Sequence, residues 1–324
     1  MKSNATRRPR LATYLLGTGL VFALLGRVVS AQEETSEIKP PRPGMISIEA
    51  AFKDKPNVSA LVAAMLQNNE TEARTLIANG ADINAKGANG LRPIHIAALY
   101  GSDEGVTLAI ALGAKVDVAT GHHESPLQYA LYPLRHPEVF RTLVEADADL
   151  AWASEQAKLA TSLSLGEYIL GHGIQFGRDD PEPIKLYWFY LENGGDIDEL
   201  NANGMSMLSV AFNQFSYNFA GKLLDRGANP YSGEPSLMDL LERENDIRPP
   251  KKLAVPFSQF IEKTKQPRDV EGLKAKAQEQ LTAHRKFREQ YEQTRRYQAE
   301  NQSSGEMKKA IEVIESELSR RKED

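Results

Sequence analysis

Cysteine is absent from this chain of 324 residues. Its absence excludes disulfide bonds, a lipid-modified cysteine and any thiol nucleophile. The sequence also lacks the motifs of common active sites, namely Gly-x-Ser-x-Gly, a glycine-rich loop followed by Lys-Ser or Lys-Thr, and His-Glu-x-x-His. We therefore predict a protein that is not an enzyme and that needs no cofactor.

Side chains that bind metals are rarely grouped in this sequence. Of the six histidines, only His122 and His123, followed by Glu124, lie together. Adjacent histidines point in different directions, and no third ligand follows at helical spacing. The segment Asp196-Ile197-Asp198 resembles the start of a calcium loop but lacks the later glycine and glutamate of such a loop. No metal site is predicted.

A four-residue phrase recurs along the chain. The same spacing, about one 33-residue period, separates the first two copies and also the last two. This period is typical of a β-turn followed by two helices, and glycine suits the left-handed turn that ends a helix. The four copies are Gly80-Ala81-Asp82-Ile83, Gly113-Ala114-Lys115-Val116, Gly194-Gly195-Asp196-Ile197 and Gly227-Ala228-Asn229-Pro230.

A second phrase lies between the glycines. Two clear copies are one such period apart, and a third is weaker: Arg92-Pro93-Ile94-His95-Ile96-Ala97, Ser125-Pro126-Leu127-Gln128-Tyr129-Ala130 and Ser206-Met207-Leu208-Ser209-Val210-Ala211. Pro93 and Pro126 fit the first turn of a helix, which Ser125 or Ser206 can cap. The phrase resembles the T-P-L-H-x-A consensus of ankyrin repeats.

The resemblance implies an all-α ankyrin-repeat solenoid, built from helix pairs with short β-turn fingers and followed by a helical C-terminal tail. We expect about five or six units between Val58 and Arg243, in a domain that spans residues 46–245. The resemblance gives His95 a local hydrogen-bonding role. Residues 246–267 are expected to close the array.

One unit departs from the period. Asp147-Ala148-Asp149-Leu150 replaces the glycine phrase there, and the next glycine phrase begins only at Gly194. The separation exceeds one period by about 14 residues, which predicts an insertion. We expect it near residues 160–183.

Residues 1–31 have the pattern of a secretory signal peptide. Lys2, Arg7, Arg8 and Arg10 precede an apolar run over residues 11–26, and small residues lie before a cleavage point after Ala31. An uncleaved anchor in the inner membrane is the alternative. Both place the array outside the cytoplasm, and the missing cysteine favours a bacterial periplasm. Residues 32–45, rich in proline and glutamate, are expected to be a linker.

The formal charge of −5 includes five positive and no negative residues of the leader, so the mature chain carries about −10. A surface of this sign repels nucleic acid and anionic lipid. We therefore expect another protein as the partner, with a basic protein as the natural complement. No small-molecule substrate is expected, and membrane contact only through an uncleaved leader.

The tail, residues 268–324, is rich in Lys, Arg, Glu and Gln with apolar residues at helical spacing. Two interpretations stay open. The tail helices pack back on the array or on each other, or they form a partner or self-association helix. A heptad series Val270, Ala277, His284 and Tyr291 favours a coiled coil in the second case but is polar.

In ankyrin proteins the fingers carry specificity, so the resemblance implies a partner surface at the fingertips and the residues just after them. Carried onto this chain, these residues are Asn89, Leu91, His122, Glu124, Asn203 and Met205. Trp188 is a second candidate, because four consecutive aromatic residues, 187–190, cannot all face inward on one helix.

These features predict an exported binding protein that sequesters or inhibits a partner. Exported bacterial ankyrin proteins include immunity factors for antibacterial toxins such as secreted lipases, and this chain is similar to that group. An envelope structural or oxidative-stress accessory protein is the alternative. An enzyme that uses His172 and Asp179 of the expected insertion is the least favoured hypothesis, since no motif supports it.

Overall fold

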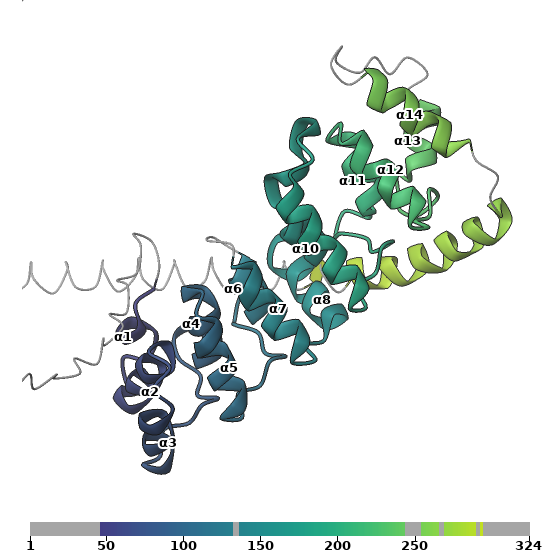
Figure 1. Cartoon of the computed structure of the whole chain (residues 1–324). Helices are drawn as coiled ribbons and strands as arrows, with labels where there is room; N and C mark the ends of the chain where they lie inside the picture. Colours follow the sequence, from purple (N-terminus) through teal and green to yellow (C-terminus); the bar gives the residue numbers. More distant parts are fainter. Residues whose placement is uncertain (1–45, 132–135, 244–253, 266–268, 290–291, 294–324) are drawn as a thin grey trace, which may run out of the picture. The chain divides into compact units, whose positions relative to one another are not determined.

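The computed structural model describes residues 46–131, 136–243, 254–265, 269–289 and 292–293 (Figure 1). The predicted leader, the linker and most of the tail beyond residue 289, including Tyr291, lie outside these ranges. The named elements of the described part are helices, with two isolated antiparallel bridges, Leu200 with Ser206 and Met205 with Gly233. None of the described helices is long and apolar enough to cross a membrane.

Five helix pairs, here called units one to five, follow one another along the described chain. A short helix α1 (Ile48–Ala51) precedes them, and α13 (Leu237–Arg243) and α14 (Ala254–Thr264) close the array against α11 and α12. The units are α2 (Pro56–Leu66) with α3 (Glu70–Ala78), α4 (Pro93–Tyr100) with α5 (Asp103–Ala111), α6 (Pro126–Leu131) with α7 (Pro137–Glu145), α9 (Leu165–Leu170) with α10 (Pro181–Glu192), and α11 (Met207–Asn213) with α12 (Tyr217–Asp225).

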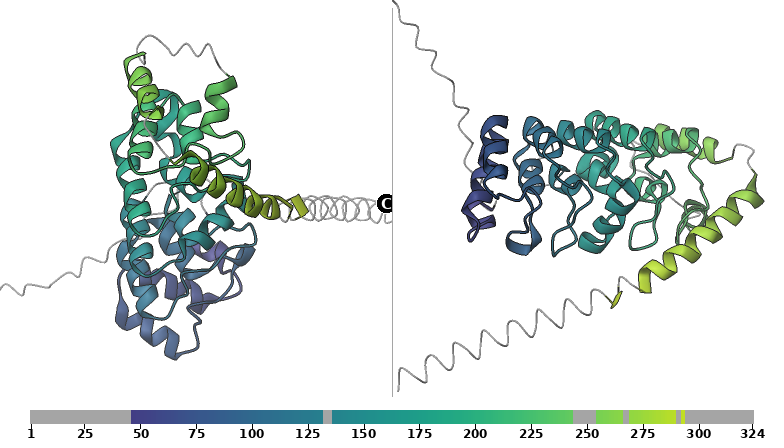
Figure 2. Two further views of the ribbon diagram at one scale, coloured as in Figure 1. Left: turned by 90° about the vertical axis from the view of Figure 1, so that its right-hand side faces the viewer. Right: turned by 90° about the horizontal axis from the view of Figure 1, so that it is seen from below.

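Neighbouring units pack on each other through their first helices: α2 contacts α4, α4 contacts α6, and α6 contacts α9. The segments that join one unit to the next, here called fingers, extend from one side of the row of helices (Figure 2). Finger one holds a 3-10 turn, η1 (Ala88–Gly90). The predicted all-α solenoid of helix pairs is confirmed.

One apolar core runs through the whole array, from Leu61 in α2 to Phe260 in α14. A second, smaller core holds α1 on the first two units and includes Phe52, Leu91 and Ile96. Because every unit hides its apolar face against its neighbours, no unit has a core of its own. The fold therefore depends on contacts between units.

The recurring glycines adopt the left-handed conformation that the sequence predicts. Gly80, Gly113, Gly194 and Gly227 have φ values of 95°, 91°, 100° and 88°. A Cβ atom added at any of them would meet no atom within 4 Å. Backbone conformation, and not space, therefore selects glycine here. Asp147 takes the equivalent place in the irregular unit, with φ 59°.

The glycine turns give a first prediction. Gly194→Val should lower the free energy of unfolding by about 1–2 kcal/mol, because a β-branched residue strains a left-handed backbone. Asp147→Gly is the matched reverse change, and it should leave stability unchanged or raise it by less than about 1 kcal/mol. Urea unfolding followed by circular dichroism measures both. Equal losses in the two variants would contradict the assignment.

The third residue of the first helix in several units accepts a hydrogen bond from the backbone that precedes the helix. This geometry confirms the local role predicted for His95 and shows that Gln128 replaces it. Ser209 is too short for this bond and donates instead to the carbonyl of Pro235, at 3.2 Å. The accepting pairs are His95 Nδ1 from Arg92 N (3.1 Å), Gln128 Oε1 from Ser125 N (2.8 Å), Glu167 Oε2 from Ser164 N (2.8 Å) and Asp239 Oδ2 from Ser236 N (2.9 Å).

His95 is fully buried, and this burial lowers its pKa from 6.5 to about 4. The imidazole is therefore neutral in the folded protein at pH 7. Between pH 6.5 and 4 the unfolded chain takes up a proton at this site before the folded chain does. The contribution of neutral His95 to the free energy of unfolding is therefore fully present above pH 6.5. It is lost as the pH drops towards 4, which lowers the free energy of unfolding by up to about 3 kcal/mol.

The second prediction uses the equivalence of His95 and Gln128. His95→Gln should keep the bond to the Arg92 amide but remove the titrating group. Stability at pH 7.5 should change by less than about 1 kcal/mol, while the loss of stability between pH 6.5 and 4 becomes smaller. Gln128→His should do the reverse. Urea unfolding across this pH range tests the pair, and parallel pH profiles for wild type and His95→Gln would refute it.

The extra residues of the irregular unit lie in two places. Helix α8 (Leu150–Thr161) takes the place of finger three, and η2 (Gly171–Gly177) lengthens the turn between α9 and α10. The extra residues thus begin earlier than the predicted range of 160–183, and α9 inside that range is a regular unit helix. The reason is local: Asp149 caps α8 by accepting the Trp152 amide at 2.9 Å.

Candidate partner-binding surface

The side chain four residues after three of the recurring glycines holds neighbouring fingers in register. Asn84, Asp117 and Asp198 each accept a backbone N–H from the next unit. The donors are Lys115, Asp149 and Asn229, at 2.9, 2.9 and 2.7 Å respectively. These bonds fix the positions of neighbouring fingers relative to each other.

The acidic pair that resembles a calcium loop has two structural roles. Asp196 closes its own turn by accepting the Asp198 amide at 2.9 Å. Asp198 in turn accepts the amide of Asn229 in the next finger. Burial raises the pKa of Asp198 to about 6, while the Asn229 amide opposes this rise. Among the described residues there is no group of three or more metal-binding side chains.

The three predicted fingertip residues, Asn89, His122 and Asn203, are exposed. Asn89 has φ 52°, and its carbonyl accepts the amide of Gly121 at 2.6 Å. This bond joins the tips of fingers one and two, so Asn89 and His122 belong to one surface. Asn203 lies on finger four, beyond α8.

The residues that follow the tips are less available than predicted. Leu91 exposes 4% of its surface and packs in the smaller core, so its place in the predicted surface was wrong. Glu124 is half-buried and accepts the hydroxyl of Tyr129 at 3.0 Å. Met205 is half-buried and pairs with Gly233 in an isolated bridge. Leu91 points inward because the backbone turns back into the array there.

The aromatic run of α10 divides between core and surface. Tyr187 and Tyr190 are buried, whereas Trp188 and Phe189 are half-buried. The guanidinium of Arg226 lies 3.9 Å from the centre of the Trp188 ring. The prediction that the four rings do not all face inward is confirmed. Trp188 already carries a cation–π contact within the chain, on a helix away from the fingers.

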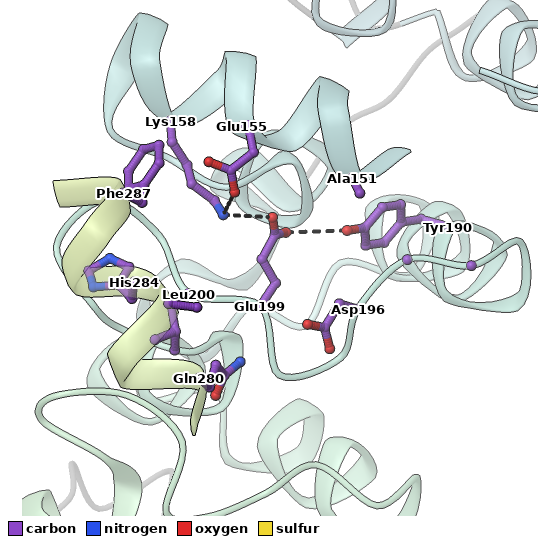
Figure 3. A pocket seen from close by; sticks show the side chains of 13 residues that line it. Ala151, Glu155, Lys158, Tyr190, Asp196, Glu199, Leu200, Gln280, His284 and Phe287 are labelled. Carbon is purple, nitrogen blue, oxygen red and sulfur yellow. Dashed lines mark hydrogen bonds and ion pairs between the residues drawn. The ribbon is translucent and has the colours of Figure 1, made fainter. Parts of the chain in front are cut away.

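A buried polar network between α8 and finger four was not predicted. Lys158 Nζ lies 2.8 Å from Glu155 Oε1 and 3.2 Å from Glu199 Oε1 (Figure 3). The hydroxyl of Tyr190 donates to Glu199 Oε2 at 3.2 Å, and Ser154 donates to Oε1 of the same carboxylate. The Lys158 and Glu199 side chains are only 8% and 12% exposed.

The charges of this network depend on each other. Burial raises the pKa of Glu199, and the nearby ammonium of Lys158 acts against this rise. Burial lowers the pKa of Lys158, but the carboxylates of Glu199 and Glu155 outweigh it, so the pKa is raised. Lys158 therefore stays charged at neutral pH. Removal of either partner leaves an uncompensated charge inside the protein.

The helix of residues 270–289 lies against this network, with the Phe287 ring centre 5.5 Å from Lys158 Nζ (Figure 3). His284 Nε2 donates to the carbonyl of Asn201 at 2.8 Å, and Gln280 donates to the carbonyl of Asp198. The amide of the Asn229 side chain donates to the carbonyl of Leu273 at 2.8 Å. A cavity of about 240 Å³ remains between α8, the turn that begins at Gly194 and this helix (Figure 3).

Part of the tail thus packs back on the array, as one of the two interpretations predicts. Ala277 and His284, two positions of the heptad series, are buried against the array with 3% and 8% exposed. Val270 is 41% exposed. No coiled coil is formed by the described part of the tail.

Residues 51–151 match the family model for ankyrin repeats, in three copies. This part of the chain consists of ankyrin repeats. The matched range covers units one to three and ends at the start of α8, where the regular finger is lost. No curated protein matches the chain.

Ankyrin repeats are typically protein-interaction modules without enzymatic activity, so these repeats indicate that the chain binds proteins. Asp179, which the least favoured hypothesis made catalytic, has a structural contact. The hydroxyl of Ser216 donates to Asp179 Oδ1, which ties the η2 turn to unit five. The side chain of His172 lies outside the described residues.

The third prediction concerns the buried pair of the ankyrin array. Lys158→Met should lower the free energy of unfolding by about 3 kcal/mol, because Glu199 stays buried without its cation. Adding Glu199→Gln should restore most of this loss. Lys185→Met breaks an exposed pair with Glu182 and should cost less than about 0.5 kcal/mol. Thermal unfolding of the four proteins tests this, and a small effect of Lys158→Met alone would contradict it.

Proposed function

We propose that this chain is an exported, non-catalytic ankyrin-repeat protein that sequesters or inhibits a partner protein. The observation that supports it best is the pair of exposed tips, Asn89 and His122, on two fingers joined by the 2.6 Å bond of the Asn89 carbonyl. Exposed polar side chains on a fixed backbone lose little entropy on binding. Such a surface suits the capture of a folded protein.

The proposed site of action is the periplasm. The basic, apolar and small-residue segments of residues 1–31 support export, either with cleavage or as an anchor in the inner membrane that faces the periplasm. The absence of cysteine suits a bacterial envelope protein.

The proposed role is that of an immunity-type factor for an antibacterial toxin. A mature chain with a charge of about −10 complements a basic partner and repels nucleic acid. An inhibitor of this kind needs a binding surface but no reaction chemistry. An envelope structural or oxidative-stress accessory protein is the second candidate, and an enzyme that uses the η2 turn is the least favoured.

The fourth prediction tests the binding role with a candidate toxin from an adjacent open reading frame. The mature chain should bind the toxin and protect cells that export it. His122→Ala or Asn89→Ala should weaken binding about tenfold or more. Arg74→Ala, on an exposed helix face away from the fingers, should leave binding unchanged. Calorimetry and growth curves measure these effects, and mass spectrometry of envelope extracts should find a chain that starts at Gln32.

Three outcomes separate the candidate functions. A chain that neither binds the toxin nor protects growth refutes the immunity role. Sensitivity of a deletion strain to peroxide, without any toxin, favours the oxidative-stress role instead. If Trp188→Ala loses binding and His122→Ala does not, the contact lies on α10 and not on the fingers.

A further inference from the structure

The helix of residues 270–289 lies where an ankyrin array contacts its partners. Its hydrogen bonds reach finger four, at Asp198 and Asn201, and finger five, at Asn229. In Figure 3 the same helix lies opposite α8, which replaces finger three. One segment of the chain therefore spans three successive finger positions, while the tips of fingers one and two stay exposed.

The covered surface, here called the masked surface, has a defined chemistry. It offers two backbone carbonyls, of Asp198 and Asn201, to donors on the helix. It also accommodates a small residue, Ala277, which is 3% exposed. Ala277, Gln280 and His284 are spaced by three and four residues, so they lie on one helix face. The masked surface thus fits a helix with a small residue followed by two hydrogen-bond donors.

Charge adds to this fit. Three carboxylates and one cation line the cavity beneath the helix, which leaves an excess of negative charge: Asp196, Glu199, Glu155 and Lys158. The helix itself carries more basic than acidic side chains, and Lys276 lowers the pKa of Asp198 against the larger rise from burial. The basic residues are Lys274, Lys276, Arg285, Lys286 and Arg288, and the acidic residues are Glu271, Glu279 and Glu289. The acidic array therefore holds a basic segment of its own chain.

The helix buries fewer apolar side chains than most helices of the array, α12 among them. Helix α12 buries Tyr217, Phe219 and Leu223. The 270–289 helix buries only Ala277 and His284 fully, and Leu273 and Phe287 stay half-buried. Burial of one alanine side chain contributes little free energy compared with an aromatic ring. Release of this helix therefore costs far less than release of α12 would.

We propose that the masked surface is a second binding site, which residues 270–289 occupy as an internal ligand until a protein partner replaces them with a basic amphipathic helix of its own. The partner helix presents a small residue and two donors at the positions of Ala277, Gln280 and His284. This proposal does not depend on the toxin, because its test needs only the chain and a peptide copy of its own helix.

The fifth prediction follows the helix in the full-length protein. Because the chain has no cysteine, Glu192→Cys and Gln278→Cys, both exposed, accept one spin label each on α10 and on the helix. Pulsed electron resonance should give one distance. A synthetic peptide of residues 269–289 should add a second, longer distance that grows to saturation. A peptide with Ala277→Asp and His284→Ala should add none.

Two variants of the labelled full chain sharpen the test. Ala277→Asp places a charge in the masked surface, so the longer distance should dominate without peptide, and the peptide should bind about tenfold more tightly or better. Ala275→Asp makes the same change on the exposed face of the same helix and should behave like the parent. The array should remain folded in both, with unchanged main unfolding transitions.

Three results would overturn the proposal. One is a distance that stays short in Ala277→Asp and does not respond to the peptide. Another is loss of the array's own unfolding transition when the helix is released, because the helix would then be a fixed part of the core. A dimer formed by Ala277→Asp, detected by light scattering, also counts against it, since a second copy and not a partner would then fill the masked surface.

Discussion

Contact between neighbouring units is the constraint on which this structure depends. No helix pair can bury its apolar face alone, so the core runs as one body through the array. Polar bonds repeat the same dependence on the finger side, where Asn84, Asp117 and Asp198 each accept an amide of the next unit. Helix packing and finger register are therefore fixed together, which gives the fingertips defined positions without a sheet or a disulfide.

The irregular middle of the array changes this pattern. Where α8 replaces a finger, the stacking bond is supplemented by a buried ion pair between Lys158 and Glu199. Ion pairs that leave water need nearly complete hydrogen bonding, and Tyr190 and Ser154 supply it. The 270–289 helix shields the same group from solvent. The departure from the repeat and the docking of the tail thus occur at one place.

The finger side consequently has two parts, one that contacts the 270–289 helix and one that does not. Fingers one and two present exposed tips and carry no contact with the 270–289 helix among the bonds described above. Fingers four and five are in contact with this helix, although the tip residue Asn203 of finger four stays exposed. The acidic character of the chain beyond the predicted leader suits both parts, since a basic helix already lies on one of them. Under both proposals, binding depends on which helix or protein occupies the fingers.

The sequence by itself determined the period, the left-handed turns and the helix starts, because these depend on residues within a few positions of each other. Gly80 and Gly194 set their turns without any neighbour within 4 Å of a side chain there. The helix starts after Ser164 and Ser236 do not match the repeat phrase, since leucine replaces proline at Leu165 and Leu237. The accepting residue three positions after each serine was a usable signal.

Only the tertiary structure decided which polar and apolar side chains are buried. Lys158 looks like an exposed helix charge in the sequence, and its partner Glu199 lies far along the chain, beyond two further helices of the array. The bonds from Gln280 and His284 reach back 82 and 83 residues. Leu91 follows an exposed turn yet lies in a core. Burial depends on segments that meet only after folding, and no local pattern of residues records those meetings.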